Sequence, residues 1–366
     1  MSTLKVTQIQ HPSSSTPAIV LDSTGAMTGS FPYPNRNLIY NGAMQVSQRG
    51  TSTASITGGG YYTADRYQVG IDSLGTWTQS VENDAPTGSG FRKSLKMLCT
   101  TADASPAASD TLRIDQYLEG QDLQRIAKGT SSAQQLTMSF WVKSNVTGTY
   151  IVWLYDNDNA RQVSASYTIS ASATWERKTI TFPADTTGAF DNDNAASLLV
   201  SFILGAGSSF TSGTLATTWA AASNANRAVG QTNLAAATNN YWQITGVQLE
   251  TGSIATPFEF KNYGQELREC QRYCYILLND VAYGTARNAT NGTVWVNFPV
   301  QMRVVPPGPS GSYTFNEAWV GDFTANVVTD SGTVNSFAIA FSGATGRTAG
   351  GAVKLRGGNI IFSAEL

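Results

Sequence analysis

The chain has 366 residues, of which 41% are hydrophobic and only 13% are charged, and its formal net charge is −2. This length predicts two or three domains, and so few charges are typical of sandwich or barrel surfaces and of subunits held in a permanent assembly. Because a duplex-binding protein needs clustered basic residues and no long basic run is present, the composition argues against a nucleic-acid partner.

Residues 1–34 form a distinct leader with few apolar side chains. Alternation at Leu4–Val6 and a shared parity at Ile19–Leu21 predict two short strands. Prolines end the leader as a stiff connector, because each proline restricts the residue before it. We interpret the leader as an arm that docks on neighbouring subunits or on another attachment protein, with a disordered tail as the alternative.

Residues 35–261 show a β pattern almost throughout. Residues 150–155 are apolar at every position, which favours a central strand covered on both faces. In the last strand of this region, the apolar residues change from even to odd positions at Gly246. A bulge at this glycine would place the apolar side chains on both sides of it on the same face of the sheet. A further strand with one face in a core is predicted by an alternation of two sets: Leu136, Met138, Phe140 and Val142 against Thr137, Ser139, Trp141 and Lys143. Strands about 10–15 residues apart with turn residues between them predict a large jelly-roll β-sandwich.

Residues 262–278 predict a short polar helix that leads into a C-terminal domain. Asn262 is placed to cap this helix. The apolar residues of this helix form only a narrow stripe, which needs a partner to cover it. A homotrimer would bury this stripe along the trimer axis. The predicted helical neck therefore has four oligomer-contact residues: Tyr263, Leu267, Cys270 and Cys274.

Residues 279–366 return to strands, since apolar residues alternate at 294–300 and at 337–341. Their number suits a small C-terminal β-sandwich. The predicted fold is thus mainly β: an extended N-terminal arm, a large jelly-roll sandwich, a short helical neck and a small tip domain.

Catalytic groups are scarce in this sequence. The single histidine, His11, lies in the extended leader, where no third group could orient it as a base, which argues against a histidine-dependent hydrolase. No phosphate-binding loop is present, and no cofactor is expected. A glycosidase needs only two carboxylates about 5–9 Å apart, so hydrolysis stays open as an alternative, although no spacing marks such a pair. We expect a protein that is not an enzyme.

Two identical tetrads, Asp-Asn-Asp-Asn, start at residues 156 and 191. Oxygen ligands at alternate positions suit Ca²⁺, so the tetrads give four weak candidates: Asp156, Asp158, Asp191 and Asp193. Neither tetrad continues into an EF-hand loop. We favour β-turns, in which Asn and Asp bond their own backbone, and predict no metal site.

Aromatic side chains are the remaining candidates for ligand binding, because sugars pack their apolar faces on exposed rings. Trp153, Trp175 and Trp242 lie in core-like strands, where packing is the favoured interpretation. The glycan-binding candidates lie in polar loops or in the tip domain, and for them subunit contact is the alternative: Trp295, Tyr313, Phe315, Trp319, Trp77 and Trp219.

Three cysteines without a C-x-x-C pair do not indicate a disulfide framework. The N-terminus lacks the apolar run of a secretion signal. No window approaches about 18 consecutive apolar residues, so we expect no membrane insertion.

Several segments resemble those of one protein family. Residues 247–259 read V-Q-L-E-T-G-S-I-A-T-P-F-E and 266–273 read E-L-R-E-C-Q-R-Y, while 36–50 read R-N-L-I-Y-N-G-A-M-Q-V-S-Q-R-G and 62–67 read Y-T-A-D-R-Y. These motifs are similar to those of tailed-bacteriophage tail-fibre and virion surface fibre proteins. M-S-F-W-V-K-S at 138–144 and W-E-R-K-T-I at 175–180 are similar to the carbohydrate-binding-module jelly rolls of the same proteins.

This resemblance covers about residues 36–276 and implies a structural virion protein, usually trimeric, that binds host surface glycan without catalysis. Such a protein is made in the host cytoplasm, is released by lysis, and contacts other virion proteins through its arm. We therefore expect a homotrimeric tail fibre on the virion surface that attaches to host polysaccharide. A capsid decoration or head-fibre protein is the first alternative, and a tailspike-type polysaccharide depolymerase is the second.

Overall fold

The computed structural model describes residues 6, 8–9, 19–21, 27–29, 34–277, 282–357 and 359–366. The chain divides into two compact units, Met1–Arg36 and Asn37–Leu366. In the first unit an antiparallel three-stranded sheet is formed by β1 (Gln8–Ile9), β2 (Ile19–Leu21) and β3 (Met27–Gly29). The strand predicted at Ile19–Leu21 is confirmed, whereas Leu4 and His11 lie outside the described residues.

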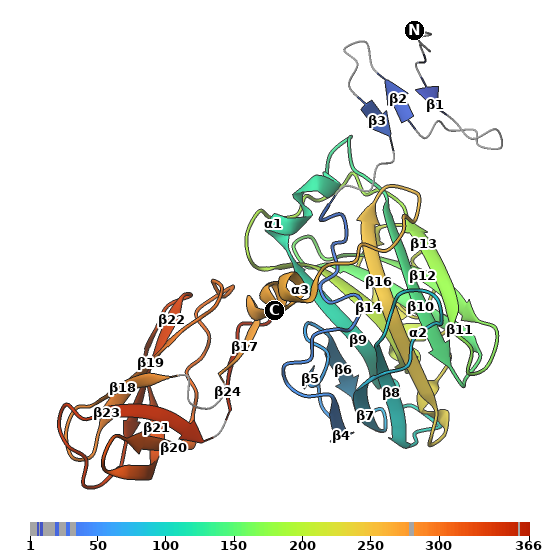
Figure 1. Ribbon diagram of the computed structural model, residues 1–366. Coiled ribbons are helices and arrows are strands. Elements are labelled where there is room, and N and C mark those ends of the chain that lie inside the picture. Colours follow the sequence, from blue (N-terminus) through green and yellow to red (C-terminus); the bar gives the residue numbers. More distant parts are fainter. Residues whose placement is uncertain are drawn as a thin grey trace. The chain divides into compact units, whose positions relative to one another are not determined.

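The body of the second unit consists of two antiparallel sheets, which confirms the predicted mainly β fold (Figure 1). The six-stranded sheet contains, in spatial order, β13 (Glu176–Phe182), β10 (Leu136–Ser144), β16 (Tyr241–Thr251), β8 (Ser94–Thr101), β7 (Thr76–Glu82) and β4 (Ser52–Ile56). The seven-stranded sheet contains β15 (Ala220–Ala221), β12 (Arg161–Ile169), β11 (Gly148–Asp156), β14 (Ala196–Ala206), β9 (Thr111–Glu119), β6 (Gln68–Asp72) and β5 (Gly60–Tyr61).

The hydrophobic core of the body lies between these sheets. Phe140 of β10 packs edge-on against Phe202 of β14, with ring centroids 5.2 Å apart. On β11, Val152 belongs to this core, while Trp153 belongs to a second apolar cluster that includes Phe210 from the 207–232 loop. The prediction that residues 150–155 are covered on both faces is therefore confirmed.

The predicted bulge at Gly246 is confirmed as well. The register between β10 and β16 shifts between Ser139 and Trp141, opposite Gly246, whose φ is 63°. The shift allows Ile244 and Val247 to face the same core, and both are fully buried.

Short helices connect the strands: α1 (Gly120–Leu123), α2 (Ser208–Thr211), α3 (Tyr263–Gln271) and the 3₁₀ turns η1 (Gln124–Ile126), η2 (Asn224–Asn226) and η3 (Leu234–Ala236). Among the described residues, none of the helices has the length and hydrophobicity that a membrane span requires.

The helical neck is shorter than the predicted 262–278. Asn262 caps α3 as predicted, accepting a hydrogen bond from the Gln265 backbone at 2.9 Å. The helix ends at Gln271, because Cys274 already begins β17 (Cys274–Leu277), which pairs with β24 (Ile360–Ser363). Strand pairing with a distant segment overrides the local helical pattern.

The predicted apolar stripe on the neck is also corrected. Cys270 and Cys274 are completely buried within this single chain, so they cannot face an axis between subunits. Tyr263 is 56% exposed and Leu267 is half-buried, which leaves these two residues of the stripe near the surface.

The tip domain closes into a barrel rather than an open sandwich. Its strands, in order around the barrel, are β18 (Tyr283–Ala286), β19 (Gly292–Asn297), β22 (Ser336–Ser342), β21 (Gly321–Gly332), β20 (Gly311–Glu317) and β23 (Ala352–Gly357). Closure occurs because β18 pairs with both β19 and β23. The barrel has its own hydrophobic core, which is separate from the core of the body.

Candidate functional site

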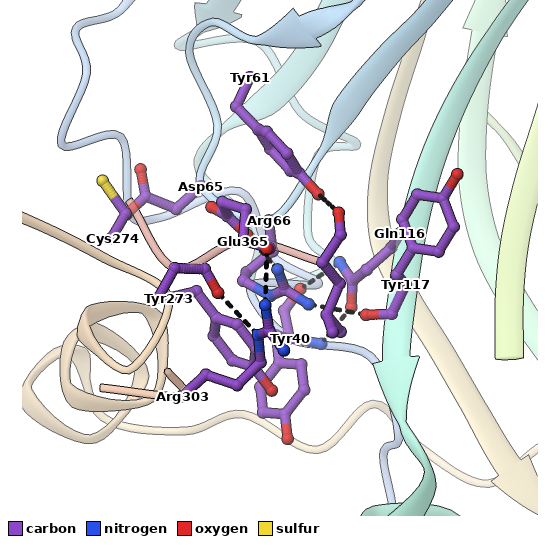
Figure 2. A network of polar contacts seen from close by, with 12 residues as sticks. Tyr40, Tyr61, Asp65, Arg66, Gln116, Tyr117, Tyr273, Cys274, Arg303 and Glu365 are labelled. Carbon is purple, nitrogen blue, oxygen red and sulfur yellow. Dashed lines mark hydrogen bonds and ion pairs between the residues drawn. The ribbon is translucent and has the colours of Figure 1, made fainter. Parts of the chain in front are cut away.

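A dense cluster of polar side chains, most of them ionisable, lies where the last residues of the sequence meet the body (Figure 2). We call it the junction, and it comprises Tyr40, Gln48, Arg49, Asp65, Arg66, Glu119, Glu266, Cys270, Arg272, Tyr273, Cys274 and Glu365. The side chain of Arg66 is fully buried and pairs with the Glu365 carboxylate. Its guanidinium also lies 3.5 Å from the Tyr273 ring centroid. Burial alone would lower the pKa of Arg66, but the charge of Glu365 raises it above its usual value.

Three of the segments that carry the family resemblance meet in the junction. The Asn41 backbone donates to Glu266 at 2.5 Å, and Gln48 donates to the Cys274 carbonyl at 2.7 Å. Arg272 forms a bidentate pair with Glu119, which is completely buried, at 2.7 and 2.8 Å. These motif residues therefore hold helix α3 and the C-terminal segment onto the body.

The two thiols of the junction are shielded from solvent. Cys270 and Cys274 are free thiols but are completely buried. Burial raises the pKa of Cys274 to about 12 and that of Cys270 well above its usual value. Since the thiolate is the reactive form of cysteine, these two thiols have a structural role.

Two of the predicted glycan-binding residues are buried and not available for a ligand, and a third is partly buried. Trp77 belongs to β7 and is completely buried, donating to the Leu74 carbonyl at 2.7 Å. Phe315 is completely buried in the barrel core. Trp219 packs against the core of the body, and its indole N–H donates to the Pro183 carbonyl at 3.0 Å. The prediction was wrong for Trp77 and Phe315 because both side chains face a core.

The other candidates lie on the barrel. Trp295 is 52% exposed and stands directly opposite Tyr283, which is 61% exposed. Cross-strand partners share one face of a sheet, so these two rings form an exposed aromatic pair. Trp319 is completely exposed in the turn between β20 and β21, and Tyr313 is half-buried at the edge of the barrel core.

The Asp-Asn-Asp-Asn tetrads are engaged within the chain. The buried Lys128 ammonium lies 2.5 Å from Asp156, and Asp158 accepts a hydrogen bond from the Asp191 backbone at 2.9 Å. Asp193 accepts from the Ala195 backbone at 2.9 Å. No group of three or more metal-ligating side chains occurs in the part of the chain that the structure describes.

The site that the sequence-based candidates missed is a cleft on the outer face of the six-stranded sheet. Its volume is about 540 Å³. Ser139 and Trp141 of β10 and Arg177 of β13 contribute from the sheet, and the loops at 83–93 and 252–262 contribute aromatic rings. The complete lining is Ser89, Phe91, Ser139, Trp141, Arg177, Gly246, Ala255, Pro257, Phe258 and Phe260. We call this the aromatic cleft.

Local structure explains how these side chains reach the aromatic cleft. Met138, Phe140 and Val142 point into the core, so the alternation along β10 turns Trp141 outward. At the bulge, a Cβ on Gly246 would lie only 2.5 Å from the Phe91 ring. Glycine is thus required for Phe91 to cover this part of the sheet.

Three phenylalanine rings form an apolar wall of the cleft. Phe91 lies 4.9 Å from Phe258 and 5.0 Å from Phe260 between ring centroids, and Phe258 lies 4.9 Å from Phe260. Phe260 is 50% exposed, so the trio presents a ring to solvent.

A second, smaller cavity of about 390 Å³ shares Phe91 with the aromatic cleft. The 83–93 loop supplies all of its lining: Asn83, Ala85, Pro86, Thr87, Gly88, Gly90, Phe91 and Arg92. The two cavities are therefore neighbours.

Asp84 fastens this loop to the sheet. Its carboxylate accepts hydrogen bonds from Lys143, from the Trp175 indole at 3.2 Å and from Gln243 at 3.2 Å. Partial burial would raise the pKa of Asp84, but these hydrogen bonds outweigh it and lower the pKa below its usual value. Asp84 is therefore ionised at neutral pH and ties the start of the 83–93 loop, which also carries Phe91, to the six-stranded sheet.

The fold and cleft define a mainly β protein with a sandwich body, a small barrel and an open aromatic site. No family model matches the sequence, and no curated protein matches it. Among solved structures, the chain is similar to the enzymatically active domain of tailspike protein 4 of bacteriophage CBA120, with 14% identity and a TM-score of 0.32. This similarity covers 60% of this chain and 22% of that one.

Two further similar structures span nearly the whole of the compared chains. The carbohydrate-binding module TmCBM61 in complex with β-1,4-galactotriose shows 9% identity and a TM-score of 0.30, covering 59% of this chain and 99% of that chain. The tripod from the baseplate of bacteriophage Tuc2009 shows 12% identity and a TM-score of 0.27, covering 90% and 96%. At such low scores these similarities carry no functional argument, so function must be argued from the chain's own residues.

Proposed function

We propose that this chain is a bacteriophage virion surface protein, a homotrimeric tail fibre, which attaches to host polysaccharide through its aromatic cleft. The observation that carries the proposal is the cleft itself. Its size lies within the range of about 300–1,000 Å³ that small-ligand sites occupy. It combines apolar rings with a few polar groups, as the two faces of a sugar require.

The lining suggests how a sugar would be held. The half-exposed Trp141 ring offers a flat apolar surface against which a pyranose ring can pack. Ser139 and Arg177 place a hydroxyl and a guanidinium beside it for the hydroxyl edges. Single contacts of this kind are weak, and several copies on one particle would raise the overall avidity.

The lining also favours binding over cleavage. Glycoside hydrolysis uses a pair of carboxylates that flank the scissile bond. The residues that line the aromatic cleft and the neighbouring cavity include no Asp or Glu. We therefore propose that the protein is not an enzyme. Incubation with host polysaccharide that yielded shortened chains would instead establish the depolymerase alternative.

Binding of purified protein to isolated host surface polysaccharide tests the site. Trp141→Ala should weaken binding about tenfold or more, because it removes the indole ring that lines the cleft. Trp295→Ala, which removes an exposed ring on the barrel, serves as the matched control and should leave binding unchanged. The opposite pattern would move the site to the barrel, and wild-type protein that does not bind would overturn the proposal.

The trimer is proposed on the family resemblance, with Tyr263 as the exposed contact residue on α3. Tyr263→Asp should reduce the sedimenting mass from three chains to one without unfolding, because the side chain is 56% exposed in the single chain. A monomeric wild-type protein would refute the trimer.

Immuno-electron microscopy of intact particles would distinguish a tail fibre from a capsid decoration protein. The same images would show whether the arm contacts other virion proteins.

A further inference from the structure

We propose that the aromatic cleft selects acidic polysaccharide, with Arg177 binding an anionic substituent on the sugar that packs against Trp141. The proposal rests on the glycan-binding function and names the class of glycan. The shared chemistry is a carboxylate or a phosphate group carried by the polysaccharide.

The charge of the lining is one-sided. Across both cavities the only ionisable residues are Arg177 and Arg92, and no carboxylate is present. The whole chain, by contrast, has 25 acidic residues against 23 basic ones. The binding surface is therefore positive although the protein as a whole is slightly negative, and such a local field attracts anions.

Arg177 is uncommitted, unlike the basic residues around it. Lys143 is paired with Asp84, and Lys178 is paired with Glu176 at 2.5 Å. Arg177 is exposed, and its side chain has no hydrogen bond or ion pair with any residue that the structure describes. Its five N–H donors are thus free to bind a ligand.

The position of Arg177 suits a substituent on a stacked sugar. Arg177 stands directly opposite Trp141 in the register between β13 and β10. Cross-strand partners have Cβ atoms about 4.5–5.5 Å apart and point to the same side of the sheet. A planar guanidinium binds a carboxylate or a phosphate through two parallel hydrogen bonds. One sugar unit can therefore contact the indole with its face and the guanidinium with its acidic group.

Arg92 extends the same chemistry to the next cavity. It is exposed and lies on the 83–93 loop, beside the shared Phe91. A polysaccharide that crosses both cavities would meet a second cation there. An acidic repeating unit therefore fits better than a single charged end.

The test uses host surface polysaccharide in three forms: untreated, with its carboxylates reduced to alcohols, and with its phosphates removed by hydrogen fluoride. We expect one treatment to weaken wild-type binding about tenfold, and that treatment identifies the anionic group. Arg177→Gln should bind all three forms alike, at the level of the wild type with the neutralised form. Arg268→Gln removes an exposed arginine from α3, outside the cleft, and should behave as wild type.

The outcomes distinguish selectivity for acidic polysaccharide from glycan binding by the cleft. Equal wild-type binding to all three forms, together with loss of binding in Trp141→Ala, would overturn acidic selectivity and keep the glycan site. A wild-type preference that survives in Arg177→Gln would overturn the role of Arg177. Absence of wild-type binding to every form would overturn both proposals.

Discussion

The junction and the aromatic cleft use arginine in opposite ways. Arg66 of the junction is buried, pairs with Glu365 and stacks on Tyr273, so each of these interactions is internal. Arg177 of the cleft is exposed and pairs with no described residue. The same side chain thus joins parts of the chain in one region and is available to a ligand in the other. Accessibility, rather than the density of charge, marks the candidate site.

The largest effect should come from breaking the junction. Arg66→Met leaves the Glu365 carboxylate in a buried site without its closest partner, which costs about 3–5 kcal/mol of folding free energy. Chemical denaturation monitored by tryptophan fluorescence would measure the loss. The control is Arg356→Met, because Arg356 and Asp322 form a pair whose side chains are 50% and 49% exposed. That change should cost less than about 1 kcal/mol, and equal losses for both variants would show that the junction is not what stabilises the chain.

A smaller effect should follow from opening the wall of the aromatic cleft. Phe260→Ala removes a half-exposed ring, so polysaccharide affinity should fall about tenfold while stability changes by less than about 1 kcal/mol. Ile254→Ala in the same loop removes a side chain that is 59% exposed and lies outside the cleft lining. Titration calorimetry should find the affinity of Ile254→Ala unchanged, and similar losses for both would argue against a specific wall.

A few-fold effect is expected from releasing the loop that carries Phe91. The pKa of Asp84 is lowered in the folded protein. The interactions of its carboxylate therefore contribute their full stability above pH 3.8, the usual pKa of this group. This stability is lost as the pH falls through the lower pKa of the folded state. Asp84→Asn should mimic this protonation at pH 7 and weaken polysaccharide binding a few-fold, because Lys143 loses its charged partner. If binding is unchanged in Asp84→Asn and also in the wild type titrated to acid pH, Asp84 does not hold the loop in place for binding.

The smallest expected signal concerns the thiols. Cys99, Cys270 and Cys274 are all buried, so the folded protein should show almost no reaction with a thiol reagent at pH 8. In the denatured protein, all three cysteines should react with the reagent. Rapid labelling of Cys270 or Cys274 in the folded protein would mean that the junction opens to solvent.

Much of the fold could be predicted from local patterns. The alternation along β10, the fully covered β11 and the bulge at Gly246 follow from side-chain periodicity, which a strand in a sandwich core enforces. Barrel closure could not be predicted, because it depends on pairing between β18 and β23, which lie far apart in the sequence. The end of α3 was missed for the same reason, since β17 pairs with β24.

The candidate site was only partly visible in the sequence. Trp141 was correctly placed among the outward positions of its strand, and an aromatic ring at such a position was a signal that could have been used. The serine, threonine and glycine residues around Trp77 predict a loop, yet such residues also occur in strands whose outer face is polar, as in β7. The cleft itself depends on loops at 83–93 and 252–262 meeting over one sheet, which no local pattern shows.

The pairing of β17 with β24 has a consequence for how such chains can diversify. The strand that enters the barrel and the strand that leaves it lie side by side, and the chain then returns to the body through Glu365. Paired strands are about 4.8 Å apart. Any replacement domain whose two ends lie equally close could be inserted there by recombination, with the anchoring residues on both sides left intact.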